Sequence, residues 1–312
     1  MRQKREQTVK AFYTDHFVLP LPEGHRFPME KYSRLRDLVS SLSGLELVEA
    51  PPATDTQILY AHDPSYLIKV IEGKLSPQEQ REIGFPWSEQ MVERSRRSAG
   101  ATVAAAKTAL REGVAANLAG GTHHAYRDTG SGFCVFNDSA IAARTLQKEV
   151  SQTLKIAVID LDVHQGNGTA SILQNDDSIF TLSIHGENNF PFKKEESDLD
   201  VGLADECNDK TYLQSLGESL DQLDARFKPN CLIFLAGADP HEGDRLGRLK
   251  ITLDGMGQRD QMVLNFAQDL QCPIAIAMAG GYGRVIETTV EVHAQTIQLA
   301  LNYYKMRKET FS

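Results

Sequence analysis

Four short apolar runs, separated by helix-like segments, constrain the fold of this chain more than any other feature. The runs are rich in β-branched residues and cover residues 155–162, 178–185, 231–239 and 273–278. Such runs are typical of strands buried on both faces, as in parallel sheets covered by helices. The predicted helices cover residues 88–111, 139–150, 258–270 and 285–305. This alternation predicts a three-layer α/β fold with a mostly parallel central sheet flanked by helices.

The length of the chain and the residues at the ends of its predicted helices are consistent with one continuous domain. The chain has 312 residues and contains no repeat, low-complexity run or Pro/Ser-rich linker, so we expect a single domain over residues 1–312. Ser88 is a candidate N-cap, Gly113 follows the end of the first helix, and Asn137-Asp138 precedes the second. A chain of this length buries enough surface to fold without a structural metal. A bound metal would therefore serve catalysis.

Charge and composition exclude several classes of protein. Lys and Arg number 33 against 42 Asp and Glu, a net charge of −9, which disfavours a general nucleic-acid binder. There is no apolar stretch of membrane-spanning length, and the charged first ten residues do not resemble a secretory signal. The four cysteines form no CxxC pair, so we expect no zinc ribbon, and a reduced, cytoplasmic location.

Each of the four runs ends in polar or glycine residues or is followed directly by them. They lie at 160–168, 183–185, 236–239 and 279–283. Because ligands bind at the carboxyl ends of parallel strands, four such ends predict an active site at one edge of the sheet. A single strand-end Asp or His more often caps a helix or binds loop backbone, and only the combination reverses that interpretation.

The first of these strand ends has the spacing of a metal site. If the strand continues, Asp160, Asp162 and His164 point to one side, and Asp162 and His164 stand about 6.6 Å apart at Cα. Both can then bind one ion, with Asp239 from another strand as third ligand. Asp160 lies about 13 Å from His164 by the same arithmetic, a position suited to orienting another group.

Two further segments are ambiguous on their own. His123-His124 follows paired glycines, which would suit a solvated loop as well as a site. Gly132 and Phe133 suit the wall of a narrow channel, although a core phenylalanine is the simpler alternative.

Taken together, these segments resemble the histone deacetylase family, whose fold is shared with arginases. The matching motifs are GGTHHA, GFCVFND, DLDVHQGNG, GADPHEGDRLG and GGYG, in family order over residues 120–283, with a weaker match at 62–66. DLDVHQGNG and GDRLG look most like the class IV branch and its bacterial relatives. The five motifs together are specific evidence for this resemblance, whereas any one of them alone would be weak evidence.

The resemblance implies a role for each matching residue. Asp162, His164 and Asp239 match the ligands of one zinc ion per chain; on ligand chemistry alone, iron(II) or cobalt remain alternatives. The matching catalytic residues are His123, His124, Tyr282, Asp160 and Asn167. The matching potassium-site residues are Asp160, Asp162, His164, Ser183 and Ile184. The matching residues of the substrate channel are Gly132, Phe133, Phe190 and Leu246, the last at the rim.

This sequence departs from the common family pattern at three places. Gln165 replaces a second histidine, Asn167 replaces the aspartate partner of the second tandem histidine, and the glycine turn before Tyr282 is shorter. The first two fit class IV.

The implied chemistry is hydrolysis of an acyl-lysine-type amide by activated water. His124 would act as general base, His123 would stay charged beside Asp160, and Tyr282 would donate a hydrogen bond to the oxyanion. No Ser or Cys lies in a nucleophile-elbow pattern, which disfavours an acyl-enzyme.

Three alternatives remain open. An arginase-like dimanganese enzyme would need extra carboxylates where Gln165 and Asn167 stand. A non-catalytic acyl-lysine binder would be expected to lack Tyr282 or a ligand. The substrate amine is a protein lysine, a small acylated amine or a polyamine, although a polyamine favours an acid where Leu246 stands. The motifs do not specify the length of the acyl group or the oligomeric state.

Overall fold

The computed structural model describes residues 8–310. Within these residues, eight parallel strands form one sheet in the order β2-β1-β3-β8-β7-β4-β5-β6. The strands are β1 (Val9–Tyr13), β2 (Leu45–Glu49), β3 (Val114–Asn117), β4 (Ile156–Asp160), β5 (Ile179–Gly186), β6 (Leu199–Leu203), β7 (Cys231–Leu235) and β8 (Ile274–Ala277). The predicted parallel α/β architecture is confirmed.

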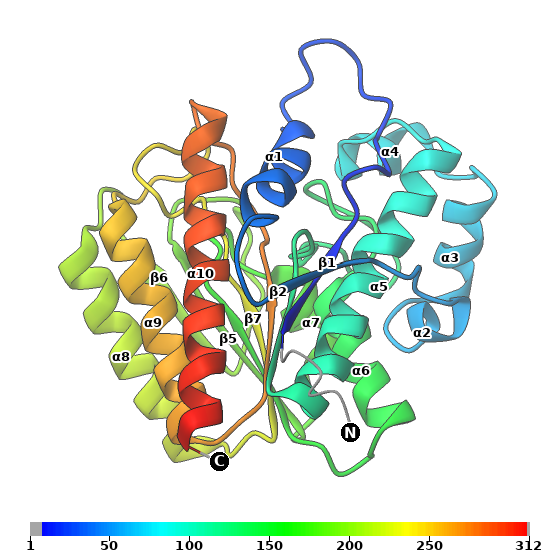
Figure 1. Cartoon of the computed structure of the whole chain (residues 1–312). Helices are drawn as coiled ribbons and strands as arrows, with labels where there is room; N and C mark the ends of the chain where they lie inside the picture. Colours follow the sequence, from blue (N-terminus) through cyan, green and yellow to red (C-terminus); the bar gives the residue numbers. More distant parts are fainter. Residues whose placement is uncertain (1–7, 311–312) are drawn as a thin grey trace.

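Helices cover both faces of this sheet (Figure 1). They are α1 (Glu30–Val39), α2 (Asp55–Leu59), α3 (Pro64–Ile71), α4 (Pro77–Ile83), α5 (Glu89–Glu112), α6 (Asp138–Glu149), α7 (Asn167–Leu173), α8 (Asp209–Arg226), α9 (Leu253–Asp269) and α10 (Ile286–Thr310). Helices α5 and α6 pack together on one face, while α8, α9, α10 and α1 form a continuous row of contacts on the other. No helix within residues 8–310 is long and apolar enough to cross a membrane.

Strand β7 illustrates how the two layers are joined. Leu232 and Phe234 belong to one hydrophobic core, whereas Ile233 and Leu235 belong to the other. Successive side chains of a strand point to opposite faces, so a continuously apolar strand supplies both cores. This explains why the runs found in the sequence show no polar alternation.

The four predicted strands are β4, β5, β7 and β8, each starting close to its expected first residue, and three of them end earlier than expected. The condition that the first strand continues to His164 is not met, because β4 ends at Asp160. The Asp160 carboxylate accepts a hydrogen bond from the Asp162 backbone N–H at 3.1 Å, in the turn that leaves the strand. The bend brings Asp162 and His164 together by turn geometry instead of strand alternation.

The four predicted helices are α5, α6, α9 and α10. Ser88 caps α5 by accepting from Met91 N, Gly113 ends it with a φ of +98°, and Asn137 caps α6. Helix α9 begins five residues earlier than expected, because Thr252 is its N-cap. The sequence interpretation missed β1, β2, β3, β6 and the remaining helices.

Candidate metal centre

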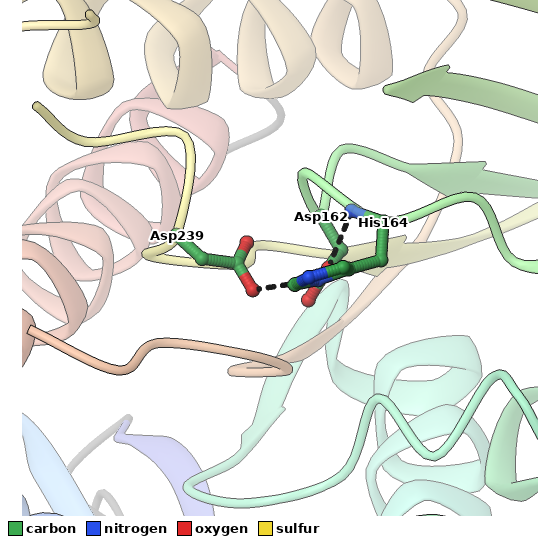
Figure 2. Close-up of side chains that lie close together, drawn as sticks. All are labelled: Asp162, His164 and Asp239. Carbon is green, nitrogen blue, oxygen red and sulfur yellow. Dashed lines mark hydrogen bonds and ion pairs between the residues drawn. The ribbon is translucent and has the colours of Figure 1, made fainter. Parts of the chain in front are cut away.

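Asp162, His164 and Asp239 meet in one buried cluster at the carboxyl edge of the sheet (Figure 2). Each offers one ligand atom, and these atoms lie within 4.8 Å of one another. His164 Nδ1 is 2.9 Å from Asp162 Oδ1 and 3.3 Å from Asp239 Oδ2. Asp162 and His164 follow β4, and Asp239 follows the neighbouring strand β7. The sheet order therefore joins ligands that lie far apart in the sequence.

Backbone groups orient both carboxylates. Asp162 Oδ2 accepts from Gly280 N at 2.8 Å, and Asp239 Oδ1 accepts from Val163 N at 2.9 Å. A Cβ on Gly280 would lie 2.1 Å from Asp239 Oδ2 and 2.4 Å from Asp162 Oδ2. Only glycine fits at that position, since the turn passes directly against the ligand oxygens.

The free oxygen of Asp239 fits a metal ion. Asp239 Oδ2 is buried and, apart from the ion pair with His164 at 3.3 Å, has no hydrogen-bond partner within residues 8–310. Burial and the charge of Asp162 raise the pKa of Asp239 to about 7. Burial lowers the pKa of His164, but the two aspartates outweigh it and raise the value to about 10. A divalent cation would satisfy the excess of buried negative charge, and a carboxylate–imidazole–carboxylate set suits zinc.

The tandem histidines lie beside this cluster with different partners. His123 Nδ1 is 2.6 Å from Asp160 Oδ2, and His124 Nδ1 is 2.6 Å from Asn167 Oδ1. Burial lowers the pKa of His123, but Asp160 and Asp162 overcome that effect and raise it to about 9. Burial, followed by the charges of His123 and His164, holds the pKa of His124 well below its usual value. At neutral pH, His123 is charged and His124 is neutral.

Asp138 holds the loop that carries the tandem histidines. Its carboxylate accepts from Gly121 N at 2.9 Å and Thr122 N at 2.8 Å, and also from Thr102 Oγ1 at 2.6 Å. Sequence reasoning treated Asn137-Asp138 only as a helix cap. Asn137 does cap α6, while Asp138 turns back to the loop, which no local pattern indicates.

Tyr282 enters the site from the turn after β8. Its backbone N–H donates to Asp244, and its side chain is buried in the wall of the cavity that reaches the metal cluster. Burial raises the pKa of the Tyr282 phenol well above its usual value, so the hydroxyl stays a hydrogen-bond donor at neutral pH. The Phe133 ring lies 6.0 Å from the Tyr282 ring.

A cavity of about 620 Å³ leads from the surface to the metal cluster. Gly132, Phe133, Phe190 and Leu246 all line it. Phe133 has a φ of +66° and Gly132 one of +54°. A Cβ on Gly132 would lie 2.7 Å from the His124 ring, so glycine keeps the channel open there. The Phe190 ring packs edge-on against His124 at 4.9 Å.

The residues matched to a potassium site lie around the end of β4. Asp160 and Ser183 are register partners in the sheet, and Ile184 follows within β5. Ser183 Oγ lies 3.0 Å from His185 Nδ1.

Arg259 is a buried positioning residue that the sequence interpretation missed. It lies in α9, is fully buried, and donates to the carbonyl oxygens of Leu161 and Gly237. These carbonyls stand next to the turns that carry Asp162 and Asp239. Asp260 balances the guanidinium charge at 2.7 Å. The sequence showed only an arginine within a predicted helix. Such an arginine is ordinarily exposed to solvent, so nothing indicated a buried role.

Comparisons with known proteins agree with this geometry. Residues 25–297 match the histone deacetylase domain. The chain is 42% identical over 295 residues to an uncharacterized protein of Picosynechococcus sp., covering 94% of this chain and 98% of the relative. It is 30% identical to histone deacetylase 2 of Arabidopsis thaliana, covering 86% and 73% respectively.

A solved structure of a histone deacetylase homologue from Aquifex aeolicus has the same fold. It aligns with a TM-score of 0.79 at 24% sequence identity, covering 97% of this chain and 89% of that one. The sheet and flanking helices are thus those of the arginase/deacetylase fold. The domain match and the Arabidopsis relative show that the chain is an enzyme of the histone deacetylase family.

Proposed function

We propose that this protein hydrolyses an N-acyl lysine-type amide with one zinc ion per chain. The observation that carries the proposal is the buried Asp162–His164–Asp239 cluster, whose ligand atoms lie within 4.8 Å of one another at a cavity open to the surface. A zinc ion held there would polarise the amide carbonyl and lower the pKa of a water molecule.

The chain's own groups would then handle the protons. His124 is neutral and can accept the proton of the attacking water, because burial and its charged neighbours lower its pKa. The same imidazole can return a proton to the departing amine. Asn167 orients the ring through its side-chain oxygen, and its amide donates to Tyr126.

His123 and Tyr282 would stabilise the negative charge that develops on the carbonyl oxygen. His123 stays charged beside Asp160, while Tyr282 supplies a neutral O–H donor. One such donor typically contributes about 2.7–4 kcal/mol to the barrier.

Several finer proposals accompany this function. We assign the chain to the class IV branch on its DLDVHQGNG and GDRLG motifs, and treat residues 1–312 as one deacetylase domain acting in the cytoplasm. A potassium ion at Asp160, Asp162, His164, Ser183 and Ile184 would brace the end of β4. Acyl-lysine proteins and small acylated amines are both candidate substrates, and nucleic acid is not expected as a partner.

The decisive experiment is hydrolysis of a fluorogenic acetyl-lysine amide by enzyme loaded with one equivalent of zinc. We expect turnover that a chelator removes and zinc restores. Metal analysis distinguishes the arginase-like alternative, which requires two manganese ions per chain. Gln165 disfavours the two-manganese alternative, because it is not a carboxylate and its side-chain amide is already hydrogen-bonded to the Glu195 backbone and to Asp200. Full zinc occupancy without hydrolysis would favour a non-catalytic binder.

A further inference from the structure

A chain of hydrogen bonds leads from His124 to a carboxylate on a separate segment of the protein. His124 Nδ1 lies 2.6 Å from Asn167 Oδ1, and the Asn167 side-chain amide donates to Tyr126 Oη at 2.8 Å. The Tyr126 hydroxyl in turn donates to Glu195 Oε1 at 3.2 Å. These bonds join the loop of the tandem histidines, the first residue of α7 and the segment between β5 and β6.

The backbone that carries the Glu195 carboxylate is held on two sides. The Gln165 side-chain amide donates to the Glu195 carbonyl oxygen at 2.7 Å, and the Gln165 side-chain oxygen accepts from the Glu195 N–H at 2.9 Å. The ammonium of the preceding residue, Lys194, donates to the carbonyl oxygens of Asn189 at 2.7 Å and Pro191 at 2.6 Å. Glu195 is therefore a fixed end of the hydrogen-bond chain.

This fixed end determines the direction of every bond in the chain. A glutamate carboxylate at neutral pH only accepts hydrogen bonds, so the Tyr126 hydroxyl donates to Glu195. The hydroxyl oxygen then accepts from the Asn167 NH₂ group, which leaves the Asn167 carbonyl oxygen to face His124. Because that oxygen also only accepts, the proton of neutral His124 lies on Nδ1 and Nε2 is bare.

The opposite orientation of the Asn167 amide would have a different outcome. Its NH₂ group would face His124, and its oxygen would accept from the Tyr126 hydroxyl. Glu195 would then lose its phenol donor, and the His124 proton would move to Nε2. In that tautomer Nε2, the nitrogen not bound to Asn167, has no lone pair to accept a proton from water. The phenol keeps its own proton, since burial, with a smaller contribution from Glu195, raises the pKa of Tyr126.

We propose that Tyr126 and Glu195 are positioning residues, which act through Asn167 to hold His124 in the tautomer whose Nε2 accepts a proton from water. This inference rests on the proposed hydrolase function. An amide can present either its oxygen or its NH₂ group to an imidazole, so Asn167 needs a partner that selects the orientation, whereas an aspartate would need none. Gln165 anchors the segment that supplies this partner. Two departures of this sequence from the common family pattern thus serve one hydrogen-bond chain.

The first test measures the tautomer of His124 directly. Long-range ¹H–¹⁵N spectra of histidine-labelled protein distinguish a protonated from a bare ring nitrogen, and the His124→Gln variant assigns the signals. At neutral pH we expect the proton on Nδ1 in the wild type and a loss of that preference in Tyr126→Phe. Spectra with and without zinc give this result whether or not hydrolysis is observed. A wild-type proton on Nε2 would overturn the proposal.

The second test uses steady-state kinetics on the acetyl-lysine substrate. Tyr126→Phe should lower kcat by about 10–100-fold and change KM less, because a misplaced proton disables the base without removing a wall of the cavity. Glu195→Gln should act in the same direction, since an amide can also donate to Tyr126. Glu196→Gln is the matched control: it removes the same charge from the neighbouring exposed residue and should leave kcat unchanged.

The Asn167→Asp background separates positioning from a structural role. An aspartate holds the Nδ1 proton without Tyr126, so Tyr126→Phe should change kcat by less than about threefold there, each protein being compared at the plateau of its pH profile. An equally large loss in both backgrounds would overturn the proposal, and so would an unchanged kcat and tautomer in Tyr126→Phe. If no protein hydrolyses the substrate, wild type included, the hydrolase function fails, and the spectra still decide the tautomer.

Discussion

The metal cluster and the part of its cavity lined by Lys31 and Arg94 carry opposite charge. Asp162 and Asp239 converge with only His164 between them, so the metal cluster has an excess of buried negative charge. Lys31 and Arg94 are buried, line the same cavity and form no ion pair with a carboxylate within residues 8–310. The two parts of the cavity therefore differ in the sign of their buried charge, negative at the metal cluster and positive around Lys31 and Arg94.

Tyr282 lies at the boundary between these two regions. Its ring is 5.6 Å from the Lys31 ammonium, and burial, with smaller contributions that include Asp162 and Asp239, raises the pKa of its phenol. One short turn, residues 279–282, contacts both regions. Its backbone N–H at Gly280 faces a ligand carboxylate, and its carbonyls face the ammonium.

The largest effect is expected when the negative region loses a ligand. Asp239→Ala should abolish both zinc retention and hydrolysis, because it removes one of three protein ligands. Metal analysis after dialysis and the fluorogenic assay measure the two effects. Asp254→Ala, at an exposed carboxylate of α9, is the control and should retain both. Full activity in Asp239→Ala would refute the ligand assignment.

Removing the hydroxyl at the boundary should have the next largest effect. Tyr282→Phe is expected to lower kcat by about 10²–10³-fold and to change KM less, because the hydrogen bond strengthens as the oxyanion forms. Steady-state kinetics on the acetyl-lysine substrate measure both constants. An unchanged kcat would mean that the phenol does not face the reacting carbonyl.

A smaller loss is expected when the support behind the metal cluster is weakened. Asp160→Asn should lower kcat/KM by about 10–100-fold, since Asp160 binds His123 and the Asp162 backbone. Loss of the carboxylate also lowers the pKa of His123, so the alkaline limb of the pH profile should move to lower pH. A purely structural role would reduce activity without moving that limb.

The smallest effect is a shift along the pH axis. His124 must be neutral to act as base, and a carboxylate at position 167 would favour its charged form. Asn167→Asp should therefore raise the pKa of His124 and move the acidic limb of kcat/KM upward by about one unit. Profiles from about pH 5 to 9 for both proteins measure it. An acidic limb that stays in place or moves down would show that His124 is not the titrating base.

Much of the metal cluster was predictable because it follows from strand order. Buried parallel strands are visible as apolar runs, and their carboxyl ends lie at one edge whatever the details of packing. Asp162, His164 and Asp239 could thus be grouped from the sequence alone. The family motifs then added Tyr282 and the tandem histidines, whose loops carry no periodic signal of their own.

The N-terminal elements were not predictable in the same way. Strands β1 and β2 have mixed burial patterns, and β3 is a run of four residues that follows α5 directly. Short or half-buried strands give little periodic signal, and their place in the sheet depends on long-range pairing. Sequence reasoning therefore left the first third of the chain almost without structure.

The sequence by itself determined the alternating architecture, the strand ends that carry ligands and the chemistry of the donor set. Tertiary structure alone decided which distant residues act on those ends. Asp138, expected near a helix cap, binds the backbone of the loop before the tandem histidines. Arg259 donates to a carbonyl oxygen close to a candidate ligand. Lys31 contacts Ala279 across 248 positions of sequence. Side chains that bind backbone need no particular residue pattern at the other end, so only the folded chain brings such partners together.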